Sequence, residues 1–336
     1  MIPLEFGVVN YNGGTSLVEC VRSLLNQRNV PVRVTVFDNA SSDNSLALLE
    51  AAGLEVDVLR SSENLGYAGA CNRLWRTFRG EYVVVCNMDL TFEPDWAEQV
   101  LGTFARHPDA WVVASLSLEA GEPLRVNSRG LGFFWDLQPQ NLDSGKVWNA
   151  AEDGEEREVF GCYGAVMAMR RSALEALDGF DDDYFLFYEE TDLAWRAALM
   201  GWPAMLQPKA RVLHERSRST VRYSPLKLFY SERNRLRTAI KIAPLWYLPL
   251  LPLLTAIRLG FQIRSGGVPS KDGAGAKVSK GTILWTLARA WMAALGKSGR
   301  DLSVRRAFWR NCPNGPLQTL HLLKRHRLDI ADLSVR

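Results

Sequence analysis

Three groups of polar residues follow apolar stretches in this sequence, and the first lies in residues 81–92, EYVVVCNMDLTF. The run from Tyr82 to Cys86 has the pattern of a buried strand of a parallel sheet, and Asp89 follows it in a polar turn. In an open α/β sheet, ligands gather beyond the carboxyl ends of the strands, where Asp89 is expected. A carboxylate there suits a hard divalent cation that bridges a diphosphate. Taken alone, however, an Asp after a strand is more often only a turn residue.

The second group is acidic and consists of Glu189, Glu190 and Asp192, which lie within four residues beside several aromatics. Burial and crowding of like charges would raise the pKa of at least one of these carboxyls, as a general base requires. The alternative is an acidic helix N-terminus, which the helix dipole stabilises. On spacing alone, that alternative is the more common one.

A histidine completes the candidate metal site. His214 ends a predicted strand, residues 205–214, MLQPKARVLH. A single His at a strand end is more often structural than a ligand. If its strand belongs to the same sheet as residues 82–86, His214 could meet a cation held by Asp89.

The third group occupies the early loops, which suit a nucleoside diphosphate. Asn10, Asp38 and Asn39 end predicted strands at one edge of the sheet, where short polar side chains could bind a base and ribose. Gly66 and Gly69 allow the backbone to approach a ligand at a helix start, where free N–H groups favour phosphate. Neither GxGxxG nor a P-loop is present, which argues against dinucleotide-binding and P-loop NTPase sites. Each Asn or Ser here could individually be a helix cap.

The elements that would position these residues alternate between strand and helix four times in ninety residues. The predicted strands are 4–10, 32–37, 56–60 and 82–86, and the pattern is typical of a doubly wound parallel sheet. A helix and a strand follow within 93–116. Residues 119–158 lack clear periodicity, which predicts either a substrate lid or acceptor loop, or a plain surface insertion.

The composition is that of a globular protein with two halves of opposite charge. The 336 residues are 47% hydrophobic and 23% charged, enough for one large domain with additions or two modest ones. Residues 1–213 carry 17 Lys and Arg against 31 Asp and Glu, and the rest carry 23 against 6. The basic half is therefore expected to face an anionic surface. Five widely spaced cysteines without metal-binding spacing predict reduced core thiols in a cytosolic protein.

The basic half contains an unusual apolar run. Residues 216–241 mix Lys and Arg with aromatics, and residues 242–257 are uncharged but interrupted by three prolines. That run is too short and too broken to span a bilayer, so it predicts an interfacial segment. A helix with a broad apolar face follows at 282–296, after a Gly/Ser/Lys-rich loop, 264–281. The alternative is a helical subdomain that packs on the core. No recognisable nucleic-acid-binding module accompanies the charge, and the N-terminus does not resemble a signal peptide.

Together these motifs resemble GT-A fold, family 2 glycosyltransferases, and rhamnosyltransferase-like members in particular. The order VVNYNGG, DNASSDNS, NLGYAGACN, NMDL, GCYGAVMAMRRSALEALDGFDDDYFLFYEETDLAWRA and VLH is typical of that family and covers about residues 4–241. Six spaced motifs make a chance similarity improbable.

The resemblance implies roles for the residues. The family's base-reading Asp falls on Asp38, and its D-x-D-type metal motif falls on Asn87-Met88-Asp89, where only the last carboxylate is present. The family's E-D-x-D motif matches residues 189–192, so the implied general base is Glu190, with Glu189 and Asp192 as alternatives because Glu replaces the usual Asp. The histidine of the family's last motif, VLH in this sequence, falls on His214. The donor-site candidates are Asn10, Asn12, Asp38, Asn39, Asn64, Gly66, Asn72 and Asn87. The implied cofactor is Mg²⁺ or Mn²⁺, held by Asp89 and His214.

The sequence thus predicts an α/β GT-A fold, Rossmann-like, with a mostly parallel central sheet flanked by helices and a basic, helical C-terminal extension. Residues 1–241 would form the catalytic domain, with a nucleotide-sugar half to about 115 and an acceptor half to 241; residues 242–336 would form a membrane-associating or packing extension. The expected reaction is inverting transfer of a sugar, favoured as L-rhamnose from dTDP-rhamnose, in bacterial surface-glycan synthesis.

The expected partners follow from that reaction. The donor is a dTDP-, UDP- or GDP-sugar, and the acceptor is a glycan or is linked to a polyprenyl diphosphate. An anionic membrane surface is expected and nucleic acid is not, which places the protein in the cytoplasm, peripheral to the inner face of the membrane. A homodimer is left open. The alternatives are a catalytically silent nucleotide-sugar-binding or scaffold subunit and, more weakly, a nucleotidyltransferase.

Overall fold

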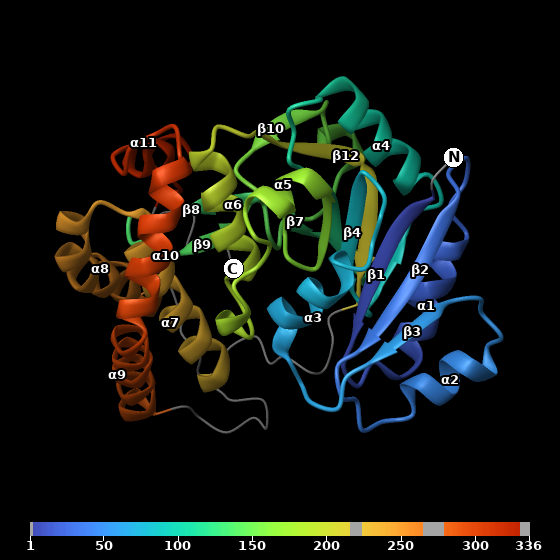
Figure 1. Ribbon diagram of the computed structural model, residues 1–336, viewed down its shortest axis with the longest axis horizontal. Coiled ribbons are helices and arrows are strands. Elements are labelled where there is room, and N and C mark those ends of the chain that lie inside the picture. The colour runs from blue at the N-terminus through green and yellow to red at the C-terminus, as the bar shows by residue number, and fades with distance from the viewer. Residues whose placement is uncertain (1–2, 216–223, 265–278, 330–336) are drawn as a thin grey trace.

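A computed structural model describes residues 3–215, 224–264 and 279–329 (Figure 1). Its centre is a ten-stranded sheet in the order β10-β12-β6-β11-β4-β1-β2-β3, with β5 on β12 and β7 on β6. These strands are β1 (Leu4–Asn10), β2 (Val32–Asp38), β3 (Asp57–Arg60), β4 (Tyr82–Asn87), β5 (Leu90–Phe92), β6 (Val112–Glu119), β7 (Arg125–Ser128), β10 (Arg157–Val159), β11 (Val166–Arg170) and β12 (Ala204–His214). A separate antiparallel pair is formed by β8 (Leu131–Phe133) and β9 (Pro139–Asn141).

The sheet is mixed but mostly parallel, because β11 runs antiparallel between β4 and β6 and thereby leaves both of them pointing the same way. β1 pairs in parallel with β2 and β4, β2 with β3, and β6 with β12. The buried strands β1 and β4 read as continuous apolar runs, as expected of strands covered on both faces. The predicted fold class is confirmed.

Helices cover both faces of the sheet. α1, α2 and α4 pack in one apolar cluster with one face, and α3, α5 and α6 contribute to the cluster on the other face. The helices of the α/β core are α1 (Gly14–Leu25), α2 (Ser45–Ala51), α3 (Gly66–Trp75), α4 (Trp96–Arg106), α5 (Arg171–Ala176) and α6 (Glu189–Leu199), with short 3-10 turns η1 (Ala150–Glu152) and η2 (Asp182–Tyr184). In α1, for example, Leu17, Val21 and Leu24 are buried at helical spacing, which orients the helix on the sheet.

A layer of C-terminal helices packs beside the core, on the side of α6 (Figure 1). It consists of α7 (Pro225–Ile242), η3 (Leu245–Leu250), α8 (Leu251–Arg264), α9 (Lys280–Gly296), α10 (Ser298–Asn311) and α11 (Gln318–Arg325). Leu236, Tyr247 and Leu322 belong to the same apolar cluster as the core residues under α6. The inner side of this layer therefore packs on the α/β core. Within the described residues, no helix is long and apolar enough to cross a bilayer.

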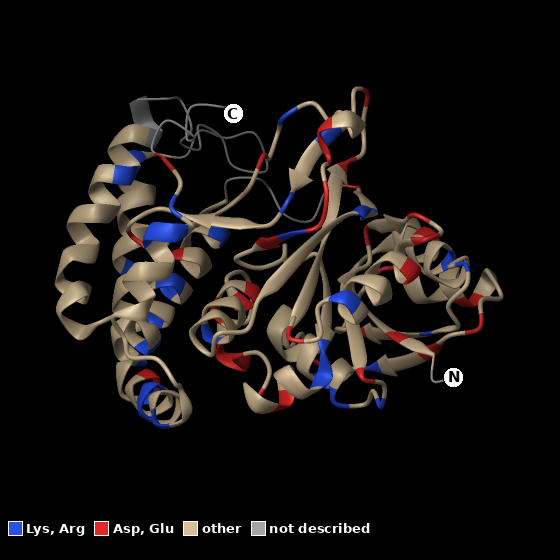
Figure 2. Cartoon of the chain, turned by 90° about the horizontal axis from the view of Figure 1, so that it is seen from above, with Lys and Arg blue, Asp and Glu red and all other residues tan. Residues whose placement is uncertain are grey.

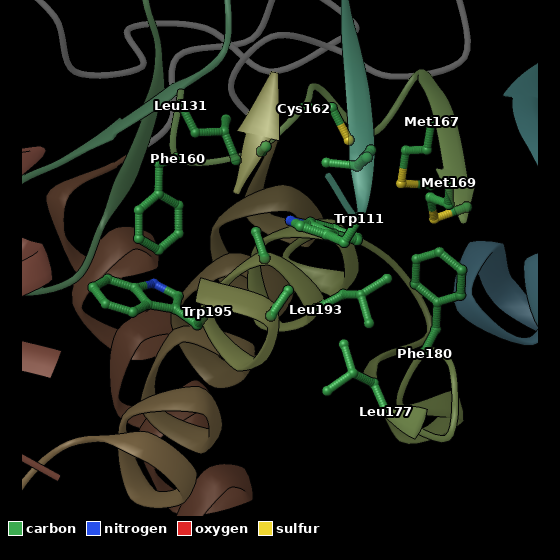
Figure 3. Packing of buried hydrophobic residues seen from close by; sticks show 14 of the residues in the cluster. Trp111, Leu131, Phe160, Cys162, Met167, Met169, Leu177, Phe180, Leu193 and Trp195 are labelled. Atoms are coloured by element: carbon green, nitrogen blue, oxygen red, sulfur yellow. The ribbon is translucent and has the colours of Figure 1, made fainter. Parts of the chain in front are cut away.

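The segment 119–158 is more ordered than its sequence suggested. It contributes β7, β8, β9 and η1, and Phe133 and Phe134 are buried. Phe133 and Phe160 both contact Trp195 of α6, with ring centroids 4.9 and 4.5 Å away, and Figure 3 shows Phe160 beside Trp195 in the same core. Alternating periodicity is hard to detect in strands of three or four residues, so these strands could not be predicted from the residue pattern.

Three basic residues of α7 do not lie on the solvent-facing surface that the composition suggested. Arg235, Arg237 and Lys241 are at most 2% exposed and pair with buried acids. Part of the positive charge of the C-terminal half is therefore neutralised inside the protein. All five cysteines are free, as predicted. The loop predicted at 264–281 lies almost entirely outside the described residues.

Candidate active site

Asp89 and His214 lie side by side at the carboxyl ends of β4 and β12. Pairing of β5 with β12 sets His214 opposite Leu90, and His214 Nε2 is 3.3 Å from Asp89 Oδ1. Both side chains are buried, and neither Asp89 Oδ1 nor His214 Nδ1 has a hydrogen-bond partner. A buried carboxylate oxygen without a donor fits a cation ligand.

The protein supplies only part of a metal shell at this pair. Nowhere in the described parts of the chain do three His, Cys, Asp or Glu side chains gather closely enough to hold a metal. A Mg²⁺ or Mn²⁺ bound by Asp89 and His214 would therefore take its remaining ligands from water and from phosphate oxygens of a substrate. Mg²⁺ commonly binds in that way, through one or two carboxylates plus substrate phosphates.

The neighbouring strand ends carry a buried polar pair. Asn10 and Asp38 are in register across β1 and β2, and Asn10 Nδ2 donates to Asp38 Oδ1 at 2.8 Å and to Ser45 Oγ at 2.9 Å. Asn10 Oδ1 is buried without a partner. The hydrogen bond from Asn10 to Asp38 fixes the rotamer of the Asp38 carboxylate at the strand end, where a base or ribose would bind.

Three other donor-site candidates shape the loops around that pair. Asn12 Oδ1 accepts the backbone N–H of Ser42 at 2.8 Å, which ties the loops after β1 and β2 together. Asn39 and Asn64 link the loops after β2 and β3: Asn39 Nδ2 donates to Asn64 Oδ1 at 3.0 Å, and Asn64 Oδ1 accepts the N–H of Gly66 at 2.8 Å. These contacts set the course of the loop that leads into α3.

Asn72 and Asn87 lie in different surroundings. Both N–H groups of the Asn72 amide donate, to the carbonyl of Phe180 and to Asp182, and its oxygen accepts from Trp75 Nε1 and the N–H of Phe180. The Asn72 amide is therefore fully engaged within the protein, which argues against its predicted contact with a donor substrate. Asn87 is the last residue of β4, partly exposed and two residues before Asp89.

The three acids of residues 189–192 have three different environments, and Asp192 is the most constrained. It accepts from Arg196 Nε at 2.8 Å, Tyr184 OH at 3.0 Å and Lys241 Nζ at 3.1 Å. Burial raises the pKa of Asp192, but the Lys241 ammonium and the Arg196 guanidinium outweigh it and hold the pKa below its ordinary value. A fully hydrogen-bonded carboxylate with a low pKa is a poor proton acceptor. These contacts argue against Asp192 as the base and favour a structural role.

Glu189 and Glu190 open helix α6, but only Glu190 is partly exposed. Glu189 is buried with Oε2 unpartnered, and burial followed by the charge of Glu190 raises its pKa well above the ordinary range. Burial also raises the pKa of Glu190, whose Oε1 accepts from Thr191 Oγ1 at 3.2 Å. A partly exposed acid with a raised pKa is suited to accept a proton from an acceptor hydroxyl.

Tyr163 connects the two ends of the site. Its ring centroid lies 5.8 Å from that of His214. Burial, then the charges of Asp89 and Glu190, raise the pKa of the Tyr163 phenol, so both carboxylates lie within electrostatic range of it. A Cβ added to Gly164 would lie 3.2 Å from Glu190 Cδ, so this glycine lets the loop pack directly against the acid. The candidate metal pair and the candidate base are thus both neighbours of the Tyr163-Gly164 turn.

Sequence reasoning missed Tyr163, Lys241 and Thr238 as neighbours of the site. Tyr163 lies in the small-residue turn GCYGA, and Lys241 and Thr238 lie more than forty residues after Asp192. Glu232 and Arg235, spaced i, i+3 on α7, were the one local sign that the basic stretch makes internal ion pairs.

Comparison with known sequences agrees with this geometry. The family model described as "Glycosyl transferase family 2" matches residues 6–178, just over half of the chain. The chain is 28% identical over 242 residues to the N-acetylglucosaminyl-diphospho-decaprenol L-rhamnosyltransferase of Mycobacterium tuberculosis, covering 64% of this chain and 76% of that protein. It is 34% identical over 140 residues to the succinoglycan biosynthesis protein ExoO of Rhizobium meliloti, covering 41% and 39%.

Solved structures share the fold. A structure of GalNAc-T7 with UDP, GalNAc and Mn²⁺ has a TM-score of 0.61 at 14% identity, covering 88% of this chain and 58% of that one. TarS of S. aureus has a TM-score of 0.56 at 15% identity, covering 99% and 54%. The mannosyltransferase PcManGT of Pyrobaculum calidifontis with GDP-Man and Mn²⁺ has a TM-score of 0.52 at 17% identity, covering 99% and 87%. At these identities the likeness shows the GT-A fold alone.

Proposed function

Because the chain belongs to glycosyl transferase family 2 and has the GT-A fold, we propose that it is an inverting, metal-dependent glycosyltransferase of bacterial surface-glycan assembly. The observation that carries the proposal is that the Asp89–His214 pair and Glu190 are all neighbours of the Tyr163-Gly164 turn. The Asp89–His214 pair suits a diphosphate and its cation, and Glu190 suits an acceptor hydroxyl.

In the proposed reaction Glu190 accepts the proton of an acceptor hydroxyl as that oxygen attacks the anomeric carbon of the donor sugar. The new bond joins the acceptor oxygen to the anomeric carbon, and the bond from that carbon to the diphosphate oxygen breaks. Attack from the face opposite the leaving group inverts the anomeric configuration. A cation held by Asp89 and His214 would neutralise charge on the departing nucleoside diphosphate. Asn10 and Asp38 would bind the nucleoside, with Asn39, Asn64 and Gly66 shaping the loop beside it.

We favour L-rhamnose from dTDP-rhamnose as the transferred sugar and a polyprenyl-diphosphate-linked saccharide as the acceptor. The name of the Mycobacterium tuberculosis relative, an L-rhamnosyltransferase acting on a diphospho-decaprenol, supports this choice. UDP- and GDP-sugars are the competing donors, and a polysaccharide end is the competing acceptor.

We also propose that the protein works at the inner face of the cytoplasmic membrane. The helical layer exposes many large apolar side chains, and Figure 1 shows α8 and α9 at the end of the molecule farthest from α2. These side chains are Leu245, Trp246, Leu250, Leu253, Ile257 and Phe261 on η3 and α8, and Leu284, Trp285, Met292 and Leu295 on α9. Figure 2 shows Lys and Arg along the same helical layer, and those at Lys280, Arg289, Arg306 and Arg310 are exposed, which suits anionic headgroups.

The donor site is tested by thermal shift with dTDP-, UDP- and GDP-sugars, each with and without Mn²⁺. We expect one nucleotide to stabilise the wild type only with Mn²⁺, and Asp89→Asn to abolish that stabilisation. Asp57→Asn, at an exposed salt bridge on β3, is the matched control and should behave as wild type. Equal stabilisation of Asp89→Asn and wild type would contradict the metal site.

The membrane surface is tested by flotation with vesicles of phosphatidylglycerol or of phosphatidylcholine. We expect binding to the anionic vesicles only, lost in a Trp246→Glu, Leu253→Glu double variant. Leu317→Glu, at an equally exposed apolar residue outside η3, α8 and α9, should still bind. Equal flotation of the double variant would contradict the proposed surface.

A further inference from the structure

The backbone just before Glu189 adopts an uncommon conformation. Phe185, Phe187 and Tyr188 have φ values of 63°, 63° and 77°, in the left-handed region, although none of them is glycine. Positive φ is a genuine outlier for bulky residues and persists only where the surroundings hold it in place. Since Tyr188 is the N-cap of α6, this turn sets where the helix begins and where Glu189 and Glu190 lie.

The turn is held through its carbonyl groups. Each of the five successive carbonyls from residue 183 to residue 187 accepts a hydrogen bond from outside the segment. Arg233 and Arg237 donate to the carbonyl of Asp183, and Arg233 and Asn234 donate to that of Tyr184. The N–H of Tyr67 donates to the carbonyl of Phe185, and Asn234 also donates to those of Leu186 and Phe187. The backbone is thus fixed by α7 on one side and by α3 on the other.

Asn234 makes the most of these contacts. Its Nδ2 lies 3.0 Å from the carbonyl oxygens of Tyr184 and Leu186 and 2.7 Å from that of Phe187. Its Oδ1 accepts from Arg233 Nε at 2.9 Å, which fixes the orientation of the amide. Asn234 is fully buried, so removal of its side chain would leave these carbonyls without their protein donor.

The same turn contacts the loop that leads into α3. The N–H of Tyr67 donates to the carbonyl of Phe185 at 2.6 Å. A Cβ added to Gly66 would lie 2.2 Å from that carbonyl oxygen, so only glycine permits the approach. The turn therefore lies between the loop that leads into α3 and the helix that carries the candidate base.

We propose that Asn234 is a positioning residue that holds the turn 184–188 and thereby places Glu190 to accept the proton of the attacking acceptor hydroxyl. Asn234 touches neither reacting group and acts through the backbone of the turn. The inference rests on the proposed role of Glu190 as general base. It adds α7, a helix beyond the region matched by the family model, to the machinery of the reaction.

The first test is hydrogen–deuterium exchange on the full-length protein, which needs no substrate. In Asn234→Ala, we expect amide exchange in residues 183–192 to be at least roughly tenfold faster than in wild type. Asn314→Ala is the control, because it removes another Asn side-chain bond to a carbonyl, that of Leu199 at 2.7 Å, far from the turn. Asn234→Ser, which retains a small donor, serves if the alanine variant does not fold. Unchanged exchange in the turn would overturn the proposal.

The second test separates positioning from simple loss of stability. Per folded molecule, we expect kcat of Asn234→Ala to fall about 100-fold, since small misplacements of a reacting group have effects of that order, while KM for the donor stays within about threefold. Asn314→Ala should keep the wild-type kcat. Wild-type kcat in Asn234→Ala would overturn the positioning role. If the wild type itself transfers no sugar, the proposed function fails instead, and the exchange measurement still decides whether Asn234 holds the turn.

Discussion

Replacement of Lys241 by Met tests whether Asp192 is structural, because Lys241 is the cation that joins it to the rest of the helical layer. Lys241 Nζ lies 2.6 Å from Asp181 Oδ2, 3.1 Å from Asp192 Oδ1 and 3.1 Å from Tyr184 OH, and the side chain is 2% exposed. Met keeps the volume of the side chain but removes its charge and all three donated hydrogen bonds.

The expected loss of unfolding free energy depends on the cationic partners that Asp181 and Asp192 keep in the variant. Breaking a buried ion pair typically costs about 3–5 kcal/mol, because the remaining charge is left without its partner. Here Asp181 keeps Arg300 and Asp192 keeps Arg196, so we expect the lower end, about 3 kcal/mol of unfolding free energy at pH 7. Arg33→Met is the control: its 2.8 Å bridge to Asp57 is exposed, and its loss should cost less than about 1 kcal/mol.

The effect should depend on pH in a defined direction. Despite burial, Lys241 and its neighbours hold the pKa values of Asp181 and Asp192 below the ordinary value of 3.8, so the native state binds fewer protons than the unfolded state. The stabilisation is therefore fully present above about pH 5 and is lost as the pH falls through the depressed pKa values. Without Lys241 both pKa values rise, so the difference between wild type and Lys241→Met should shrink between about pH 5 and pH 3.

Urea denaturation at pH 7, 5 and 3, followed by tryptophan fluorescence, measures this difference. The result that would refute the reasoning is a Lys241→Met protein as stable as Arg33→Met at pH 7. A difference that stays constant or grows towards pH 3 would also refute it, since the loss would then not come from paired carboxylates.

Three further predictions follow from the site. Glu189→Gln should raise the melting temperature by about 2 °C at pH 7–8 and by less at pH 4. The pKa of Glu189 is raised in the folded state, so its ionisation destabilises the fold only when the pH exceeds the ordinary pKa of a glutamate; equal shifts at both pH values would contradict this. Gly66→Ala (φ 72°) should be destabilised well beyond Gly53→Ala (φ 63°, with open space around it) in thermal melts, and equal melting temperatures would argue against the close approach to Phe185. His214→Ala should weaken Mn²⁺ affinity by about 10-fold or more in titration calorimetry with the nucleotide present, whereas unchanged affinity would remove His214 from the metal site.

The sequence was sufficient to predict the mostly parallel sheet, and it allowed Asp89 to meet His214 if their strands belonged to that sheet. Both residues end apolar strand patterns, and parallel strands bring such ends to one edge, so local periodicity carries the information. The same logic placed Asn10 beside Asp38.

The distinction among Glu189, Glu190 and Asp192 could not be predicted in that way. It depends on which acid meets Lys241 and Arg196, and the Lys241 contact joins residues 49 positions apart across two helices. The left-handed turn before α6 was equally hidden, since positive φ there falls on Phe and Tyr rather than on the Gly or Asn that normally signals it. Tertiary contacts, chiefly from α7, fix both features.

The most direct test of the account is a comparison of sugar transfer and donor binding in Glu190→Gln, with Glu189→Gln as the control. We expect the kcat of Glu190→Gln to be at least about 100-fold lower than that of the wild type. Its affinity for the donor in the presence of Mn²⁺ should stay within about twofold of the wild-type value, and Glu189→Gln should retain transfer. Transfer at the wild-type rate by Glu190→Gln would contradict the assignment of the base. If neither the wild type nor Glu190→Gln transfers sugar although both bind the donor, the protein would instead be a silent nucleotide-sugar-binding subunit.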